Sequence, residues 1–238
     1  MAIRRGEIIT RIIENGLTHN IDASNRVTYP RSGVKVYNTV DTDITGSFIN
    51  DVAYNSVSPD NFQFGLDGVD DIIRFESHFA AYGQTDITLS YWFRLLGSPA
   101  SAWHGLSNEI ATQLPFRSRI LIKENLAQLL YTLTLNGQKS ITPISFSLNT
   151  WHNVVITKDS IVGTKVYLDN VYKGGHSTET GAITGTSSTT VGGTDVGRGY
   201  ESGYYMNGNM ASIHVYDRAL STTELTHNYN ALRSRFGV

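Results

Sequence analysis

Apolar and polar residues alternate along most of this chain, and alternation with a period of two is the pattern of β-strands. In the segment DITLSYWFRLL, residues 86–96, Ile87, Leu89 and Tyr91 fall on one face of a strand, and the residues between them fall on the other. Short segments of the same kind recur between turn sequences: FQF, RSRILIK, LLYTLTL, WHNVVITK, TKVYLDN and ASIHVYD. About a dozen such strands, without β-α-β alternation, predict an all-β fold of two packed antiparallel sheets.

Two segments have the period of a helix instead. Near the N-terminus, residues 7–13 repeat isoleucine at helical spacing and end at Asn15-Gly16, which predicts a short amphipathic helix. Near the C-terminus, Ser221 and Glu224 have the spacing of a capping box and precede apolar residues on one helical face. We therefore expect one short helix before the strands and one helix after them.

Composition narrows the class of protein. The 238 residues, 40% of them hydrophobic, suffice for one large β domain, so we expect an arm or short helix over residues 1–15 and one domain over residues 16–238. A net charge of -2 without a long basic cluster favours neither nucleic acid nor an anionic membrane surface as a partner. The chain has no cysteine, no apolar run typical of a signal peptide and no stretch long enough to span a membrane, so we expect a soluble protein made in the cytoplasm.

The segment NFQFGLDGVDDIIRF, residues 61–75, holds three carboxylates between two alternating runs. Its Asp67-Gly68 step is typical of a tight turn, so we predict a β-hairpin over this segment. Under this interpretation Asp70 and Asp71 are turn residues, and Asp67 is at most a minor metal ligand.

Residues suited to catalysis do not form a recognisable pattern. Seven histidines occur, but no G-x-S-x-G elbow accompanies them, and no two have the i, i+4 spacing of a helical zinc pair. The glutamates are scattered, whereas a retaining glycosidase needs two carboxyl groups about 5 Å apart. We predict that the protein is not an enzyme.

Four stretches, in order, resemble the laminin-G-like branch of the concanavalin A-like lectin/glucanase superfamily. They are GLTHNIDASNRVTYPRSGVKVYN (16–38), the segment 61–75, NTWHNVVITKDSIVGTKVYLDNVYKG (149–174) and NGNMASIHVYDRALSTTELTHNYNALRSRFG (207–237). The resemblance implies a two-sheet antiparallel jelly-roll sandwich, with the short N-terminal helix and the C-terminal helix added. Glucanases of this superfamily carry E-x-D-x-x-E on one strand, and no E-x-D occurs here.

Chains with this opening and this DGVDD segment look like a set that is common in tailed bacteriophages. That resemblance implies a non-catalytic structural or decoration protein of the virion, made in host cytoplasm, with other virion proteins and copies of itself as partners. The alternative is a carbohydrate-binding adhesin for host or surface attachment, and a glycoside hydrolase is a third, weaker hypothesis. The position on a particle, whether capsid, tail or fibre, stays open.

Two loop regions have the residues that bind sugars, namely aromatic rings that stack on a pyranose and amides or carboxylates that bond to its hydroxyls. Contact with neighbouring subunits is the alternative role of these loops. The candidate residues are Trp103, His104, Asn108, Asp195, Arg198, Tyr200, Tyr204, Tyr205 and Asn207.

One loop suggests calcium. DTDITG has oxygen-bearing side chains at relative positions 1, 3 and 5 and a glycine at 6, as in the first half of an EF-hand loop, but Val52 stands where a bidentate Glu is needed. A hard-cation site would use Asp41, Asp43 and carbonyl oxygens, with Asp67 from a neighbouring loop. The alternative is a solvated acidic turn, and the fold requires no cofactor.

Overall fold

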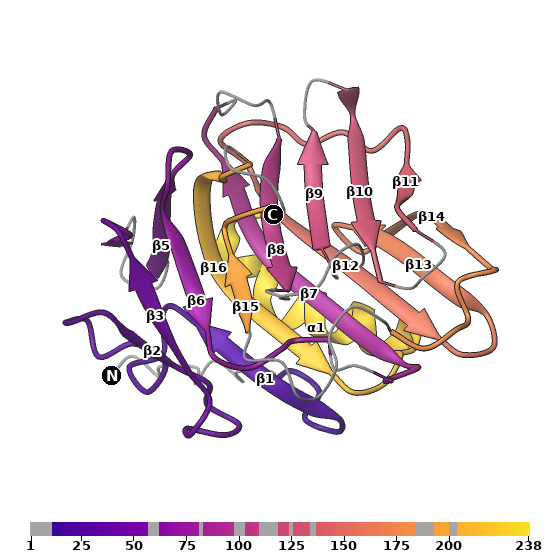
Figure 1. The fold of residues 1–238 in the computed structure, drawn as a ribbon, viewed down its shortest axis with the longest axis horizontal. Helices are drawn as coiled ribbons and strands as arrows, with labels where there is room; N and C mark the ends of the chain where they lie inside the picture. Colours follow the sequence, from indigo (N-terminus) through magenta and orange to yellow (C-terminus); the bar gives the residue numbers. More distant parts are fainter. Residues whose placement is uncertain are drawn as a thin grey trace, which may run out of the picture.

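The computed structural model describes residues 11–56, 62–80, 83–97, 103–109, 119–123, 126–133, 137–183, 193–199 and 204–238. The chain forms two antiparallel sheets that pack face to face, as the alternation predicts (Figure 1). In spatial order, sheet A contains β14 (Val171–His176), β13 (Gly163–Leu168), β12 (Trp151–Asp159), β7 (Ile87–Leu95), β16 (Asn207–Tyr216), β5 (Phe62–Asp67) and β4 (Ala53–Ser56), and β1 (Leu17–Asp22) also pairs with β16. Sheet B contains β11 (Lys139–Ile141), β10 (Gln128–Thr132), β9 (Arg119–Lys123), β8 (His104–Glu109), β15 (Thr194–Val196), β6 (Ile72–Phe75), β3 (Thr45–Ile49) and β2 (Lys35–Tyr37).

The main core lies between the two sheets and is built from alternate residues of their strands. Tyr91 and Phe93 of β7 and Val154 of β12 face Ile73 of β6 and Ile122 of β9, and all five side chains are fully buried. Removing this apolar surface from water is the main favourable term for a sandwich of this kind. The intervening residues of each strand point to the outer faces of the sheets.

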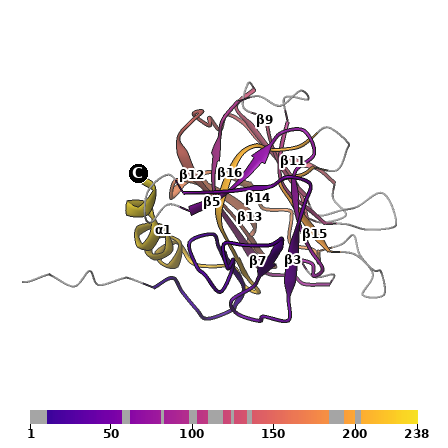
Figure 2. The same ribbon diagram turned by 90° about the vertical axis from the view of Figure 1, so that its left-hand side faces the viewer.

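One helix, α1 (Thr222–Phe236), covers the outer face of sheet A, on the side away from sheet B (Figure 2). The predicted capping box at its start is present, because Ser221 accepts a hydrogen bond from the Glu224 amide and Glu224 accepts one from the Ser221 amide. Phe236 stacks on Trp92 with 4.4 Å between ring centroids and also packs on Trp151. The two tryptophans are therefore core residues of the helix–sheet layer.

The predicted N-terminal helix falls largely on residues 1–10, which lie outside the described residues. Its described end, residues 11–14, contains no helical turn. The segment binds α1 and β16 through main-chain groups instead: the Ile13 amide donates to Asn228 Oδ1 on α1 at 2.8 Å, and the Tyr216 hydroxyl on β16 donates to the Ile13 carbonyl at 3.0 Å. Because these side chains satisfy backbone groups that a helix would pair internally, an extended arm is stable here.

The prediction of a β-hairpin over residues 61–75 is wrong. β5 pairs with β4 and β16 in sheet A, whereas β6 pairs with β3 and β15 in sheet B. The segment is an arch that connects the two sheets, and Gly68, with φ of 80°, provides the sharp turn. Alternation fixes which side chains face the core, but it does not specify which strand is the hydrogen-bonding neighbour.

Candidate functional site

The outer face of sheet B carries a row of polar side chains, one from each of seven neighbouring strands. Their strand neighbours, such as Ile73, Val196 and Ile120, point into the core, so these residues point outward. The register places them directly beside one another across the sheet. In order from β2 to β10, the row is Lys35, Ser47, Arg74, Asp195, Asn108, Arg119 and Thr132.

Asp195 is the centre of this row and is only 1% exposed. Arg74 donates to its carboxylate from Nε and Nη2, at 2.8 and 3.0 Å, and Arg198 Nη1 lies 3.4 Å away. A bidentate pair of this kind fixes the plane of the guanidinium group. The hydrogen bond to Asp195 raises the pKa of Arg74 above its usual value.

Three buried polar atoms in or beside the row have no hydrogen-bond partner within the described part of the chain: Asn108 Oδ1, Thr132 Oγ1 and Arg198 Nε. Asn108 and Thr132 belong to the row itself, at positions on either side of Arg119. A buried polar atom without a partner costs about 1–3 kcal/mol, so water or a ligand that reaches this row would regain part of that free energy.

Aromatic side chains lie on the same side of sheet B, toward the ends of β8 and β9 that are four to five residues from the row. The rings of Trp103 and Tyr204 are 6.1 Å apart, and Lys123 Nζ lies 4.8 Å from the centroid of the Trp103 ring. Arg198 Cζ lies 5.8 Å from the centroid of the Tyr205 ring, and the two residues form an isolated β-bridge. We call Trp103, Tyr204 and Tyr205 the aromatic rim.

The turn after β15 reaches the rim because β8 lets it approach closely. A Cβ atom on Gly105 would lie 2.0 Å from the Gly199 amide nitrogen and 2.1 Å from the Arg198 carbonyl carbon. Only glycine allows this contact. The close approach places Arg198 and Tyr204 over β8 and β9.

The structure brings most of the predicted sugar-binding residues together, but not all of them. Trp103, Asn108, Asp195, Arg198, Tyr204 and Tyr205 gather on the outer face of sheet B, and Tyr200 lies outside the described residues. His104 is fully buried, and its Nδ1 accepts from the Asn207 amide at 3.3 Å. His104 and Asn207 thus link β8 to β16.

Sequence reasoning missed Arg74, Arg119 and Lys123. Each lies in an alternating strand segment, where a charged residue reads as an ordinary solvent-facing position. The strand register brings Arg74 and Arg119 into line with Asp195, and a ring contact brings Lys123 to the rim. The sequence does contain one signal for these three residues: several strand segments each place a charged residue at a position that alternation assigns to the outer face.

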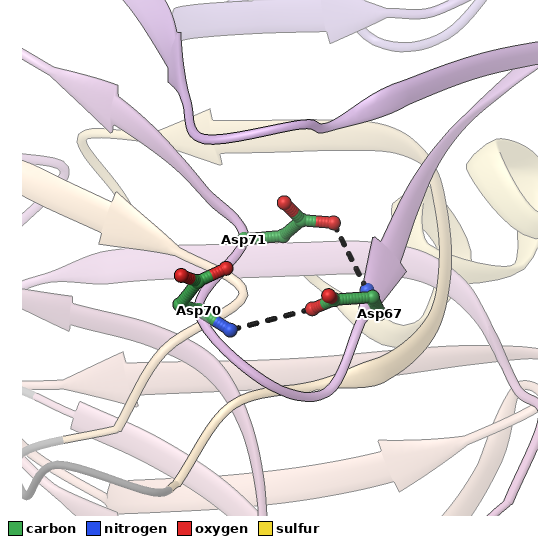
Figure 3. A group of neighbouring side chains, drawn as sticks. All are labelled: Asp67, Asp70 and Asp71. Carbon is green, nitrogen blue, oxygen red and sulfur yellow. Dashed lines mark hydrogen bonds between the residues drawn. The ribbon is translucent and has the colours of Figure 1, made fainter.

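The arch between β5 and β6 holds three carboxylates, from Asp67, Asp70 and Asp71, with one oxygen of each within 4.8 Å of the others (Figure 3). Asp67 Oδ1 accepts hydrogen bonds from the amides of Val69 and Asp70, and Asp71 Oδ2 accepts one from the Asp67 amide. Burial, and then the charge of Asp67, raise the pKa of Asp71. These bonds close the turn, so turn formation accounts for the three acids.

The predicted calcium residues do not form one group of three in the described part of the chain. Asp41 and Asp43 are exposed, and the Asp43 amide donates to Asp41 Oδ1 at 3.0 Å, as in a solvated acidic turn. Asp67 lies with Asp70 and Asp71 instead. Calcium takes about 6–8 oxygen ligands, and three carboxylates would supply only part of that shell. Calcium binding stays a prediction.

Glu109 is a second buried carboxyl group, next to Asn108 on β8, but it faces the interior. It lies 2.6 Å from His78 Nδ1, and it accepts hydrogen bonds from the amides of Phe79 and Ala80 and from the Thr194 hydroxyl. Burial raises its pKa. Glu109 ties β8 and β15 to the segment after β6 and is a structural residue.

A groove of about 640 Å³ lies on the opposite side of the molecule, between the N-terminal arm, β1 and α1. Its floor contains Asn20, Asp22 and His214, and Leu17 and Leu232 line its walls. None of the described residues that line it is a Trp, Tyr or Phe. The groove therefore lacks the stacking surface that the aromatic rim of sheet B provides.

Comparison with known families shows to which superfamily the chain belongs. The family profile Laminin_G_3, described as the concanavalin A-like lectin/glucanases superfamily, matches residues 67–226, which is more than half of the chain. The chain belongs to this superfamily. The match includes all of the stretch 149–174 and parts of the stretches 61–75 and 207–237, and the family membership predicted from the sequence is confirmed.

Solved structures of similar fold include domain 4 of AbnA, a GH43 extracellular arabinanase from Geobacillus stearothermophilus, in complex with arabinotriose. It has a TM-score of 0.67 and 14% identity, and the match covers 91% of this chain and all of that domain. The botulinum neurotoxin serotype G binding domain has a TM-score of 0.67 and 17% identity, with 91% of this chain and 51% of that chain covered.

Trypanosoma rangeli sialidase, in complex with the inhibitor DANA, has a TM-score of 0.65 and 14% identity over 94% of this chain. The match covers 35% of the sialidase, so this chain spans about a third of that protein. No curated protein matched the chain by sequence. No helix among the described residues has the length and apolar character needed to cross a bilayer.

Proposed function

We propose that this protein is a non-catalytic carbohydrate-binding domain and that it binds its ligand on the outer face of sheet B. The observation that carries the proposal is the pairing of the aromatic rim with the polar row. Trp103 and Tyr204 lie toward one end of β8 and β9, and roughly 13 Å further along these strands the row holds the buried, unpartnered oxygens of Asn108 and Thr132.

This arrangement suits the two needs of sugar recognition. Ring faces of Trp103 and Tyr204 stack on the C–H face of a pyranose or furanose, and Asn108, Thr132 and the arginines replace the hydrogen bonds that sugar hydroxyls make with water. Because Asp195 holds Arg74 in one orientation, little side-chain entropy is lost when a ligand binds.

Similar folds support the class of ligand. The AbnA domain of matching size was solved with arabinotriose, and the sialidase was solved with sialic acid and with DANA. At about one identical residue in seven, these proteins share the fold of this chain. A shared fold does not specify the ligand, so the ligand has to be identified by measurement.

The absence of catalysis is part of the proposal. On the outer face of the described strands of sheet B, Asp195 is the one carboxylate of the central row, and two arginines hold it. A glycosidase mechanism of the usual type needs a second carboxyl group within about 5–10 Å. Incubation with oligosaccharides that bind should therefore release no reducing ends.

A place on a phage particle remains our proposal for the biological setting, together with partners among virion proteins and copies of this chain. It rests on the opening DASN…YPRSG and on DGVDD, which look like segments of tailed-phage proteins. Mass spectrometry of purified particles from a host that carries the gene would test it, and a protein found only in the soluble lysate would contradict it.

The test of the binding function is a glycan array that includes arabinotriose and sialosides, followed by calorimetry on the best ligand. We expect Trp103→Ala and Tyr204→Ala each to weaken binding about tenfold, because each removes a stacking surface. Tyr172→Ala is the matched control, since Tyr172 is an exposed tyrosine on β14 of sheet A. An array without signal, or full affinity in both rim variants, would contradict the proposal.

A further inference from the structure

The outer face of sheet B is positively charged, although the chain as a whole carries a net charge of -2. On the outward positions of the described strands β6, β15, β8 and β9, and on residues 197–199 after β15, there is one carboxylate, Asp195, and Glu76, directly after β6, pairs with Lys35. Four cationic side chains accompany it on the same positions: Arg74, Arg119, Lys123 and Arg198. Positive charge has therefore been concentrated on one face of a slightly acidic protein.

We infer that the ligand of this face is an anionic oligosaccharide, one that carries carboxylate or sulfate groups. The inference rests on the proposed carbohydrate-binding function and names the ligand class of that site. A neutral sugar would displace water from these cations without supplying negative charge in its place, and removing a charged group from water is costly. An anionic sugar supplies the compensating charge.

Asp195 prepares two of the four cations for this role. It takes the Nε and one Nη2 hydrogen of Arg74, so the remaining N–H groups of that guanidinium point away from the pair, and the side chain is 42% exposed. Arg198 shares the same carboxylate and is 30% exposed. Planar guanidinium groups held in this way match the paired oxygens of a carboxylate or a sulfate.

The spacing of the cations indicates more than one sugar unit. Arg74 and Arg119 lie in register on β6 and β9, with β15 and β8 between them. Three steps between strands of about 4.8 Å each separate their Cα atoms by roughly 14 Å. Lys123, beside the ring of Trp103, extends the positive charge to the aromatic rim. The ligand is thus an oligosaccharide with charges repeated along it.

The test uses the full chain on matched pairs of immobilised oligosaccharides. One pair is trigalacturonic acid and its carboxyl-reduced form, and the other is a sulfated heparin tetrasaccharide and its desulfated form. We expect stronger binding to the anionic member of at least one pair, and the pair that responds identifies carboxylate or sulfate as the anion. Raising ionic strength from about 0.05 to about 0.5 M should weaken that binding about tenfold, because salt screens exposed charges.

Two variants assign the effect to this face. Arg119→Gln and Arg198→Gln should each weaken binding to the anionic member about tenfold, and should weaken any binding to the neutral member much less, because only hydrogen bonds and no charge pair are lost there. Arg233→Gln is the matched control, because Arg233 is exposed on α1, and α1 covers sheet A on the other side of the molecule. The salt response of the unaltered chain shows whether charge contributes to binding, even where a variant does not fold.

The outcomes separate this inference from the function on which it rests. Equal binding to both members of each pair, without an effect of salt, would overturn the inference and leave carbohydrate binding intact. An effect of Arg233→Gln as large as that of Arg119→Gln would overturn the assignment to sheet B. Absence of binding to every glycan would overturn both proposals.

Discussion

At the scale of single residues, the site depends on how a buried carboxylate is kept charged. Asp195 is enclosed by neighbouring side chains, and its two oxygens are held by Arg74 and Arg198. Removing one partner of such a pair leaves a buried charge with less compensation, which is more harmful than removing both partners.

We therefore expect Arg74→Met to destabilise the fold by about 1–3 kcal/mol, because Asp195 keeps only the longer contact to Arg198. The range extends down to about 1 kcal/mol because Arg74 is partly exposed, and solvent weakens its attraction to Asp195. Chemical denaturation at neutral pH measures the change, and Arg233→Met on α1 is the control. The double variant Arg74→Met, Asp195→Asn should recover part of the loss, and a double variant no more stable than Arg74→Met would contradict this account.

Residues also show where sequence reasoning reached its limit in the site. Trp103 and Tyr204 were predicted because turn residues flank them and loops carry binding side chains. Arg74 was missed because its partner Asp195 lies 121 positions away, and only the strand order brings the two together. A pattern read along the chain carries no information on such pairs.

At the scale of elements, the layer between α1 and sheet A is unusual because it contains buried polar groups. Ser90, Asn153 and His214 lie under the helix beside Trp92, and they line a cavity of about 10 Å³, which is close to the room one water molecule needs. Burial lowers the pKa of His214 to about 4, and the nearby Asp22 opposes this shift. Burial likewise lowers the pKa of His19, on β1, to about 4.

His214 under the helix and His19 beside Phe79 should make the fold sensitive to acid. Both histidines have a usual pKa of 6.5, so between pH 6.5 and about 4 the unfolded chain takes up protons that the folded chain does not. Stability is then full above pH 6.5 and falls on acidification, by up to about 3 kcal/mol for each histidine.

His214→Gln should remove about half of this loss between pH 6.5 and 4, and His19 should account for the rest. Denaturation midpoints at a series of pH values measure the slope. His227→Gln, on the exposed side of α1, is the control and should leave the slope unchanged. A slope that His214→Gln does not alter would contradict this explanation.

Most strands and the C-terminal helix could be predicted from the sequence, but which strands pair with one another could not. Alternation located most strands, and the Ser221–Glu224 spacing located α1, because both signals are local. The arch of residues 62–75 looks like a hairpin because its two strands have the correct alternation and an Asp-Gly turn. The decision between an arch and a hairpin depends on β16 and β15, which follow more than 115 residues later along the chain.

At the scale of the whole molecule, the two ends of the chain complete sheet A. β1 pairs with β16, from Leu17 beside Tyr216 to Asp22 beside Ser212, and α1 follows β16 and covers it. Pairs of such large sequence separation form only after much of the chain has been ordered, so we expect slow folding compared with a helical protein of this size.

Removal of α1 tests how far the sandwich depends on it. A chain that ends at Leu220 would expose Trp92, Trp151 and Tyr216, and the lost burial amounts to at least about 5 kcal/mol. We expect that chain to bind a hydrophobic dye and to aggregate on size-exclusion chromatography. Deletion of Gly237 and Val238 alone is the control. Cooperative unfolding of the shortened chain at the normal midpoint would contradict the prediction.

The N-terminal arm and α1 lie together on one side of the molecule, because the Arg11 carbonyl accepts a hydrogen bond from His227 and the Ile13 amide donates to Asn228. Strands β3 and β15 of sheet B lie on the other side from α1 (Figure 2), and the polar row is on the outer face of that sheet. Residue 11 and the end of α1 therefore both lie on the side of the sandwich away from the outer face of sheet B. Many copies mounted by their ends on a common surface would all present sheet B outward, and weak binding by each copy would add up to firm attachment.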